Sequence, residues 1–217
     1  VPILAELSPI AGVTVDEVFL AMAAANTGNP DGVRGHPNWN TIPAYLTPDP
    51  DDIRLNGKYI CRFGKKASVY NLLHQVVFAL NEDIGITSSF DPLDVYSLKD
   101  IGPEVSDQTV RDLVFYLQTE KAPPPRDQND PQVIQGKNVF VQIGCESCHR
   151  QTLKTGYSPV SALSYKEFHP YTDLLVHDMG PGLDDGYTEG DARTSEWRTA
   201  PLWGLGLSPR SQGGLYY

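Results

Sequence analysis

Four stretches of the chain repeat apolar residues at intervals of three and four, which is the spacing of one face of an α-helix. These stretches cover residues 14–25, 68–82, 107–119 and 130–142. The remaining segments lack such a period, and we predict loops there, including one at residues 208–214. The exception is a short run of apolar residues near 174–176, which predicts a strand. The pattern as a whole therefore favours a helical protein with long loops.

Two of the predicted helices begin with recognisable start signals. Thr14 and Glu17 stand three residues apart, as in a capping box. Asp130 is followed directly by Pro131, and proline suits the first position of a helix because its missing N–H is not needed there. Gly136 lies within this last helix, and we expect another helix to approach closely at its bare backbone.

The segments between the helices are rich in Gly, Pro, Asn and Asp, which favour turns. Residues 26–40 form such a loop. Its Asp and Asn oxygens can hold calcium, although the spacing of an EF-hand is absent. Residues 152–181 are also expected to be mainly loop. Residues 122–130 hold three consecutive prolines beside charged residues and predict an extended linker. We place the domain boundary there, with a helical segment at 1–121 and a second domain at 131–217.

Residues 145–149 read Cys-Glu-Ser-Cys-His, and this pattern is the attachment signature of c-type haem. The thiols of Cys145 and Cys148 add to the two vinyl groups of the porphyrin. The imidazole of His149 follows directly and binds the iron as the proximal ligand. The sequence therefore predicts one covalent haem in this chain.

Other uses of a Cys-x-x-Cys pair explain the pentapeptide less completely. A structural zinc site needs four ligands, and Cys61 is the only other cysteine. A redox-active pair is expected beside a βαβ pattern, which the sequence lacks. A disulfide between Cys145 and Cys148 leaves His149 without a role. Cys61 itself is interpreted as a small buried apolar residue.

The composition narrows the possible partners. Of the 217 residues, 40% are hydrophobic and 20% are charged, and the formal net charge is −10. This charge argues against nucleic acid or an anionic membrane as a partner, since both favour a basic surface. It suits a small basic protein that donates electrons. No apolar run reaches the length of a membrane span. Because haem is attached to such motifs outside the cytoplasm, we expect an exported, periplasmic protein.

The sixth iron ligand is sought downstream of His149, since electron-transfer haems commonly pair His with Met or with a second His. Met179 is one of two methionines and lies in the turn sequence Asp-Met-Gly-Pro. It is our first candidate for the distal ligand, and His177 is the second. His169 is expected to make a structural hydrogen bond instead.

Several blocks of the sequence resemble one protein family. Residues 170–183 read PYTDLLVHDMGPGL and residues 196–206 read EWRTAPLWGLG. These two blocks are similar to the bacterial di-haem oxidoreductases, which are described as thiol-oxidoreductase-like and are related to the di-haem cytochrome c peroxidases. Residues 62–67 (RFGKKA) and 83–87 (DIGIT) match more loosely. The resemblance extends from about residue 14 onward.

The resemblance implies an all-α fold, in which a cytochrome c-like haem domain with long loops follows a helical segment of the same family. It implies that His149 is the proximal ligand and Met179 the distal one. In the related peroxidases this haem is the centre where electrons enter. A second haem domain of the same protein and a small electron-donor protein are the implied partners.

Two departures from the family leave alternatives open. The chain has one Cys-x-x-Cys-His motif where the family has two, and it stops where the family continues into a closing helix. We therefore expect a fragment in which the domain at 131–217 is truncated. The alternatives to a peroxidase-like oxidoreductase are a single-haem electron carrier without enzymatic activity and a haem-based sensor. No catalytic acid or base is assigned, and Arg198 and Glu196 are interpreted as surface or structural charges.

Overall fold

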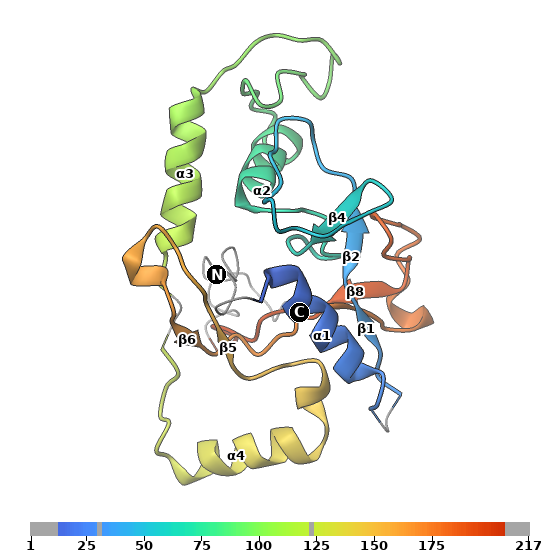
Figure 1. The fold of residues 1–217 in the computed structure, drawn as a ribbon, viewed down its shortest axis with the longest axis vertical. Coiled ribbons are helices and arrows are strands. Elements are labelled where there is room, and N and C mark those ends of the chain that lie inside the picture. The colour runs from blue at the N-terminus through green and yellow to red at the C-terminus, as the bar shows by residue number, and fades with distance from the viewer. Residues whose placement is uncertain (1–12, 30–31, 122–123, 207–217) are drawn as a thin grey trace.

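The computed structural model describes residues 13–29, 32–121 and 124–206, and Figure 1 shows their arrangement. The α-helices are α1 (Val15–Asn26), α2 (Leu72–Phe78), α3 (Asp107–Thr119) and α4 (Pro131–Gln142). The strands are β1 (Gly35–His36), β2 (Asn38–Asn40), β3 (Arg54–Leu55), β4 (Lys58–Cys61), β5 (Leu153–Lys154), β6 (Glu167–Phe168), β7 (Val176–Asp178) and β8 (Glu196–Arg198). A π-helical turn at Ala79–Asp83 extends α2, and short 3-10 turns occupy Cys145–Ser147, Ser161–Leu163 and Pro181–Leu183.

The predicted all-α fold is wrong. The fold is mixed α/β, with 31% of the residues in helices and 14% in strands. The strands are two to four residues long and pair as small antiparallel sheets. A strand of two or three residues is too short to display a two-residue alternation of apolar and polar side chains. The segments at 26–40 and 152–181, predicted mainly as loops, therefore also contain β1, β2, β5 and β6, while the strand predicted near 174–176 overlaps β7.

One sheet connects segments that are far apart in the chain. Its strand order is β1-β7-β8, with Gly35 opposite His177 and His177 opposite Trp197. A second sheet has the order β2-β4-β3, and a third pairs β5 with β6. The first sheet therefore joins a strand before residue 121 to two strands after residue 131. The division into domains at 122–130 stays a prediction.

The helices begin where their capping residues allow. The start signals at Thr14 and Asp130 are confirmed, since both side chains accept hydrogen bonds from the first turn of α1 and α4. The helix expected from residue 68 begins later, at Leu72. Val69 forms a β-bridge with Phe63, and the Asn71 side chain then caps α2 by accepting a hydrogen bond from the His74 N–H at 2.9 Å.

Replacing Thr14 by alanine is expected to destabilise the protein by about 1 kcal/mol, because the change removes one half of a capping box. Thr14 Oγ1 accepts from the Glu17 N–H at 3.2 Å, and the Glu17 carboxylate accepts from the Thr14 N–H at 2.7 Å. Urea unfolding followed by circular dichroism measures the loss. Thr14→Ser keeps the hydroxyl and serves as the control. Equal stability of the two variants would contradict the role of the cap.

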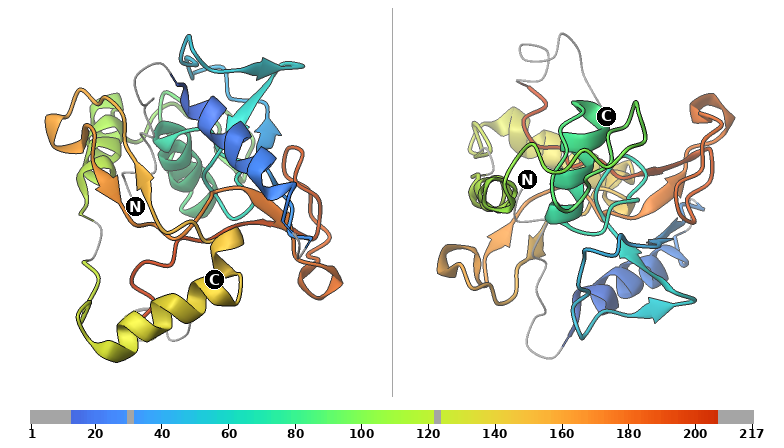
Figure 2. Two further views of the ribbon diagram at one scale, coloured as in Figure 1. Left: turned by 60° about the horizontal axis from the view of Figure 1, so that its bottom comes forward. Right: turned by 90° about the horizontal axis from the view of Figure 1, so that it is seen from above.

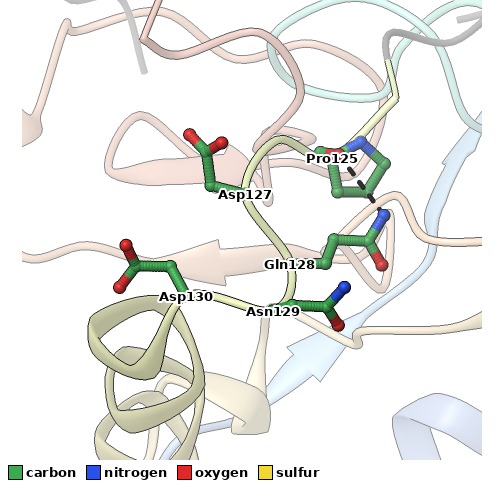
Figure 3. Close-up of a pocket in the computed structure, with 5 residues that line it drawn as sticks. All are labelled: Pro125, Asp127, Gln128, Asn129 and Asp130. Carbon is green, nitrogen blue, oxygen red and sulfur yellow. Dashed lines mark hydrogen bonds between the residues drawn. The ribbon is translucent and has the colours of Figure 1, made fainter.

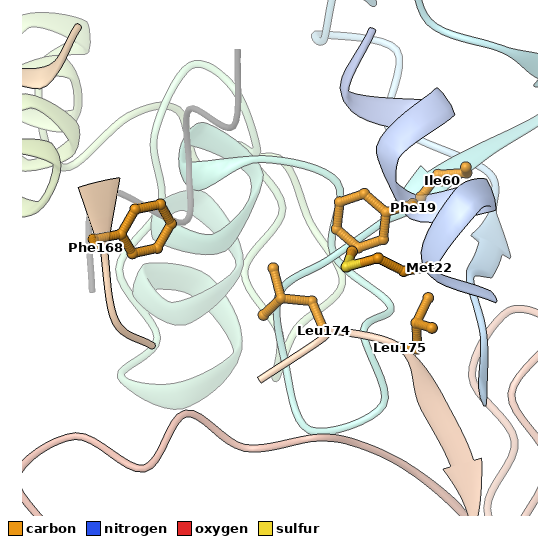
Figure 4. Packing of buried hydrophobic residues seen from close by; sticks show 6 residues of the cluster. All are labelled: Phe19, Met22, Ile60, Phe168, Leu174 and Leu175. Carbon is orange, nitrogen blue, oxygen red and sulfur yellow. The ribbon is translucent and has the colours of Figure 1, made fainter. Parts of the chain in front are cut away.

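The main apolar core joins α1 to β4, to β6 and to the segment that leads into β7, and Figure 4 shows its buried side chains. Its buried residues are Phe19, Met22, Ile60, Phe168, Leu174 and Leu175. Met22 packs in this core at 6% exposure, which is the environment of a core residue rather than of an iron ligand. A further cluster fixes α2 against α3 through Val76, Val77 and Val110. The contacts between α2 and α3 hold together part of the N-terminal half of the described chain.

Helix α4 differs from the other helices in its packing. None of its residues is buried, and Figures 1 and 2 show it at the margin of the molecule, away from α1, α2 and α3. No heavy atom beyond its own helix and its chain neighbours lies within 4 Å of the point where a Cβ on Gly136 would be. The expected approach of another helix at Gly136 is therefore not seen among the described residues. Across that part of the chain, no helix combines the length and the apolar character that a bilayer-spanning segment requires.

Candidate haem site

The Cys-x-x-Cys-His segment begins where α4 ends. Gly144 follows the helix with φ of +83°, a left-handed conformation that glycine adopts without a steric penalty. The chain then makes one 3-10 turn at Cys145–Ser147, and the His149 N–H donates to the Cys145 carbonyl at 2.9 Å. This turn brings the two thiols and the imidazole to one side of a single loop.

The imidazole of His149 is oriented by a backbone carbonyl. His149 Nδ1 lies 2.7 Å from the Tyr171 oxygen. Because a carbonyl can only accept, this contact assigns the proton to Nδ1 and leaves Nε2 with a free lone pair. The rings of Phe140 and Tyr171 meet edge to face at 5.7 Å, and Phe140 also packs against His149 at 6.3 Å. A histidine that binds a metal through one ring nitrogen usually donates a hydrogen bond from the other, as His149 Nδ1 does to the Tyr171 carbonyl.

A cavity of about 720 Å³ brings the predicted site residues together. Its lining residues are Lys65, Gly144, Cys145, Cys148, His149, His177, Met179, Leu183, Trp197, Arg198, Thr199, Ala200 and Leu202. Both cysteines, His149 and both candidate distal ligands are among them. The volume lies within the range of roughly 300–1,000 Å³ that is typical of small-molecule and cofactor sites.

The two candidate distal ligands have different surroundings. His177 is buried on β7, with Nε2 2.9 Å from Asp173 Oδ2 and Nδ1 3.6 Å from Cys148 Sγ. Burial lowers the pKa of His177, but the hydrogen bonds to Asp173 and Cys148 outweigh it and raise the pKa to about 10. Gly35 on β1 lies so close that a Cβ there would be 2.5 Å from the His177 ring. Met179, in contrast, is 53% exposed.

The far wall of the cavity is formed by β8 and the residues that follow it. Glu196 is buried and anchors this strand by accepting hydrogen bonds from His36 Nε2 at 3.1 Å and from the Arg193 N–H at 2.8 Å. Burial acts to raise the pKa of Glu196, but these hydrogen bonds outweigh it and lower the pKa. Glu196 therefore has the structural role that the sequence suggested. Trp197 donates from its indole N–H to the Leu183 carbonyl at 2.7 Å and faces the cavity.

Several residues of the cavity lining were not predicted as site residues from the sequence. Lys65, Leu183 and Leu202 were not considered as site residues, and Arg198 was treated as a surface or structural charge. Their positions became apparent only from the pairing of β8 with β7 and from the backbone contact of β8 with Lys65. The one signal in the sequence is that Lys65 and Arg198 both belong to the blocks that resemble the family.

Two further interpretations are tested by the structure. His169 makes the expected structural hydrogen bond, with Nδ1 3.0 Å from Thr152 Oγ1. Cys61 is confirmed as a buried residue at 1% exposure, and burial raises the pKa of its thiol to about 12. In the described ranges, no group of three or more His, Cys, Asp or Glu side chains is arranged to hold a metal ion. Asp31, the only carboxylate in residues 26–40, lies outside the described ranges, so the calcium site considered there stays a prediction.

A second hollow, of about 580 Å³, lies along residues 125–130 and is shown in Figure 3. All of its lining residues come from this one exposed loop, which Gln128 closes by donating to the Pro125 carbonyl at 3.3 Å. A binding site usually collects side chains from several segments around an apolar centre. We therefore interpret this hollow as a result of how the loop is folded, and not as a binding site.

Comparison with protein families identifies a family that covers most of the chain. The family described as "Di-haem oxidoreductase, putative peroxidase" matches residues 8–212. The chain therefore belongs to the di-haem oxidoreductase family, as its motifs predicted, and the membership implies a haem cofactor and a redox role. Searches of curated proteins and of solved structures found no match.

The residues around the cavity fit the haem that the family implies. Two thiols and an imidazole with a free Nε2 lie at one wall, and the Met179 thioether lies in another part of the lining. Much of the remaining lining is apolar, including Leu183, Ala200 and Leu202. A haem iron needs only one or two protein ligands because the porphyrin supplies the others. The lack of a larger cluster of metal-binding side chains among the described residues is thus no obstacle.

Proposed function

We propose that this chain carries one covalent c-type haem and transfers electrons as part of a peroxidase-like di-haem oxidoreductase. Cys145 and Cys148 form the thioether bonds, His149 binds the iron on the proximal side and Met179 binds it on the distal side. When bound, the haem supplies one-electron chemistry at iron, while the protein sets its ligands and excludes water. Within the larger oxidoreductase, this haem is the centre where electrons enter.

A single observation carries the proposal. The two cysteines, His149 and Met179 line one cavity, although Met179 lies thirty residues after His149 in the sequence. The hydrogen bond from His149 Nδ1 to the Tyr171 carbonyl supports the ligand role, because it directs the imidazole and leaves Nε2 for the metal.

The surroundings of His177 favour Met179 as the distal ligand. His177 Nε2 is engaged by the buried carboxylate of Asp173, and β1 lies against the ring at Gly35. Binding iron through Nε2 would leave the Asp173 carboxylate with only the neutral donors Asn26 Nδ2 and the Leu175 N–H, and a buried charge that loses its counterion is costly. Met179 has no comparable contact to lose, and its position on an exposed turn lets it reach into the cavity.

The compartment and the partners follow from the cofactor and the charge. Thioether attachment of haem takes place outside the cytoplasm, so we propose a periplasmic protein. The net charge of −10 suits a small basic protein as electron donor, since opposite charges speed encounter. A second haem domain of the same protein is the proposed electron acceptor, and it fits the family.

The test is a pair of spectra of the purified chain. An alkaline pyridine haemochrome spectrum is expected to show one thioether-linked haem, and the ferric spectrum is expected to show the red-edge charge-transfer band of Met ligation. Met179→Ala is expected to abolish this band and to lower the reduction potential, because thioether ligation raises it. Met22→Leu, at the other methionine, serves as the control and keeps the band. Loss of the band in His177→Gln alone would contradict the assignment.

The exposure of Met179 favours one alternative function. A ligand that is 53% exposed on a turn can leave the iron and open a site for a small gas molecule. A haem sensor is expected to bind carbon monoxide rapidly when reduced, whereas a stably Met-ligated electron-transfer centre resists it. Rapid binding by the unmodified chain would therefore favour the sensor.

A further inference from the structure

The haem cavity is locally basic in a protein that is acidic overall. Lys65 and Arg198 are both in its lining, and none of the described residues that line it is acidic. The chain as a whole has a formal net charge of −10. Two cations without a carboxylate beside an apolar wall indicate that the cavity is built for an anionic ligand.

A tight turn separates the roles of two adjacent lysines. The Ala67 N–H donates to the Gly64 carbonyl at 3.3 Å, and Gly64 adopts a φ of +81°. Lys66 is buried, and its ammonium donates to the carbonyls of Arg193, Thr194 and Glu196 at 3.0–3.1 Å. Lys65 is exposed and lies in the cavity lining instead. Lys66 thus fixes the strand β8 against the turn, and Lys65 stays available to a ligand.

Arg198 is held beside Lys65 by two backbone contacts. The Arg198 N–H donates to the Lys65 carbonyl at 2.8 Å, and Arg198 Nε donates to the Gly64 carbonyl at 2.7 Å. Both contacts leave the two terminal nitrogens of the guanidinium without a partner among the described residues. Burial lowers the pKa of Arg198 to about 10, and no carboxylate offsets this effect.

Two other basic side chains near the cavity, Lys66 and Arg193, each have an acidic partner. Lys66 lies 3.2 Å from Asp185, and Arg193 lies 3.0 Å from Glu196. A partly buried cation without a counterion is unfavourable, so it is normally paired. Arg198 and Lys65, by contrast, are cations of the cavity lining for which the described residues supply no anionic partner.

We propose that Lys65 and Arg198 bind the two propionate carboxylates of the porphyrin and so fix which edge of the ring lies at β8. This inference rests on the proposed function, since it assigns one edge of the same haem. The planar guanidinium suits a carboxylate through two parallel hydrogen bonds, and the exposed ammonium adds a more mobile contact. The turn at residues 64–67 and the strand β8 thus each supply one side chain that binds a propionate.

The first test uses the haem-loaded chain. Arg198→Met is expected to lower the reduction potential, because a positive charge near the haem favours the reduced state. Lys65→Met is expected to lower it less, and only at low ionic strength, since salt screens an exposed charge. Arg54→Met and Lys99→Met, on exposed residues that do not line the cavity, remove the same charge as controls. Potentials equal to those of the controls would overturn the proposal.

The second test needs no iron and no covalent attachment. Chain purified without haem is titrated with protoporphyrin IX and with its dimethyl ester, and binding is followed by quenching of tryptophan fluorescence. The unmodified chain is expected to bind the free acid about tenfold more tightly than the ester, the factor expected for one charge-assisted hydrogen bond. Arg198→Met with Lys65→Met is expected to lose this preference, and Arg198→Lys is expected to keep part of it.

The two tests separate the two proposals. If the chain attaches haem but shows no preference for the free acid, the role of Lys65 and Arg198 is wrong and the haem assignment stands. If the chain attaches no haem but prefers the free acid, Lys65 and Arg198 bind porphyrin carboxylates and the covalent attachment at Cys145 and Cys148 is wrong. Should Arg198→Met fail to fold, as judged by circular dichroism, Lys65→Met and Arg198→Lys still decide the question.

Discussion

Replacing Cys145 and Cys148 together by serine is expected to abolish covalent attachment of haem completely. The two thiols are the only groups in the proposed site that can form thioether bonds with the porphyrin. Mass spectrometry of the denatured protein measures the attachment, because covalent haem stays with the chain after unfolding. Each single variant is expected to retain the haem through one bond.

Cys61→Ala provides the matched control for this experiment. Cys61 is the third cysteine of the chain, and it is buried in the cluster with Leu46 and Tyr70. The control therefore loses a thiol and some stability, but it is expected to keep a full complement of haem. Covalent haem in the double variant, or its loss in Cys61→Ala alone, would refute the attachment site.

Phe19→Ala is expected to destabilise the fold by about 3–5 kcal/mol, the usual effect of removing a fully buried aromatic ring. Phe19 is 0% exposed and lies in the core that joins α1 to β4 and to the segment that leads into β7. The change leaves a cavity that the surrounding side chains can fill only in part. The Arg62 guanidinium, 5.7 Å from the ring centre, also loses a contact. Urea unfolding measures the change in the free energy of unfolding.

The neighbouring residue supplies the control. Leu20 is on the same helix but is 37% exposed, so Leu20→Ala keeps the helix and removes little buried surface. We expect it to destabilise the protein by less than about 1 kcal/mol. Similar losses for the two variants would mean that the core at Phe19 does not determine stability.

The helices could be predicted from the sequence because their signals are local. The capping side chains and the apolar faces of α3 and α4 are contained in about a dozen adjacent residues, and these bounds were predicted correctly. The start of α2 was missed because Val69 is taken by a bridge to Phe63. Most strands were missed because they are very short, and β1 and β8 also pair with a strand from a distant or separate segment, whereas the strand predicted near 174–176 overlaps β7.

The residues of the candidate site also differ in whether a local signal in the sequence predicted them. Cys145, Cys148 and His149 are adjacent, and their spacing alone indicated the cofactor. The partner of His177 had a weaker signal, since Asp173 stands four residues before it. The proximity of Lys65 and Arg198 could not be predicted from residues adjacent in the sequence. It arises because β8 places Arg198 against the carbonyl of Lys65, more than a hundred residues earlier.

The pairing of β1 with β7 has a consequence for the order of folding. The two strands are separated by about 140 residues, and closing so long a loop is entropically unfavourable and slows folding. During synthesis, β1 leaves the ribosome long before its partner exists. Until the segment leading into β7 emerges, Phe19 and Met22 of α1 also lack their apolar partners Leu174 and Leu175, and the exposed apolar surface can associate with other chains. Interrupted translation is therefore expected to give an aggregation-prone intermediate rather than a smaller folded unit.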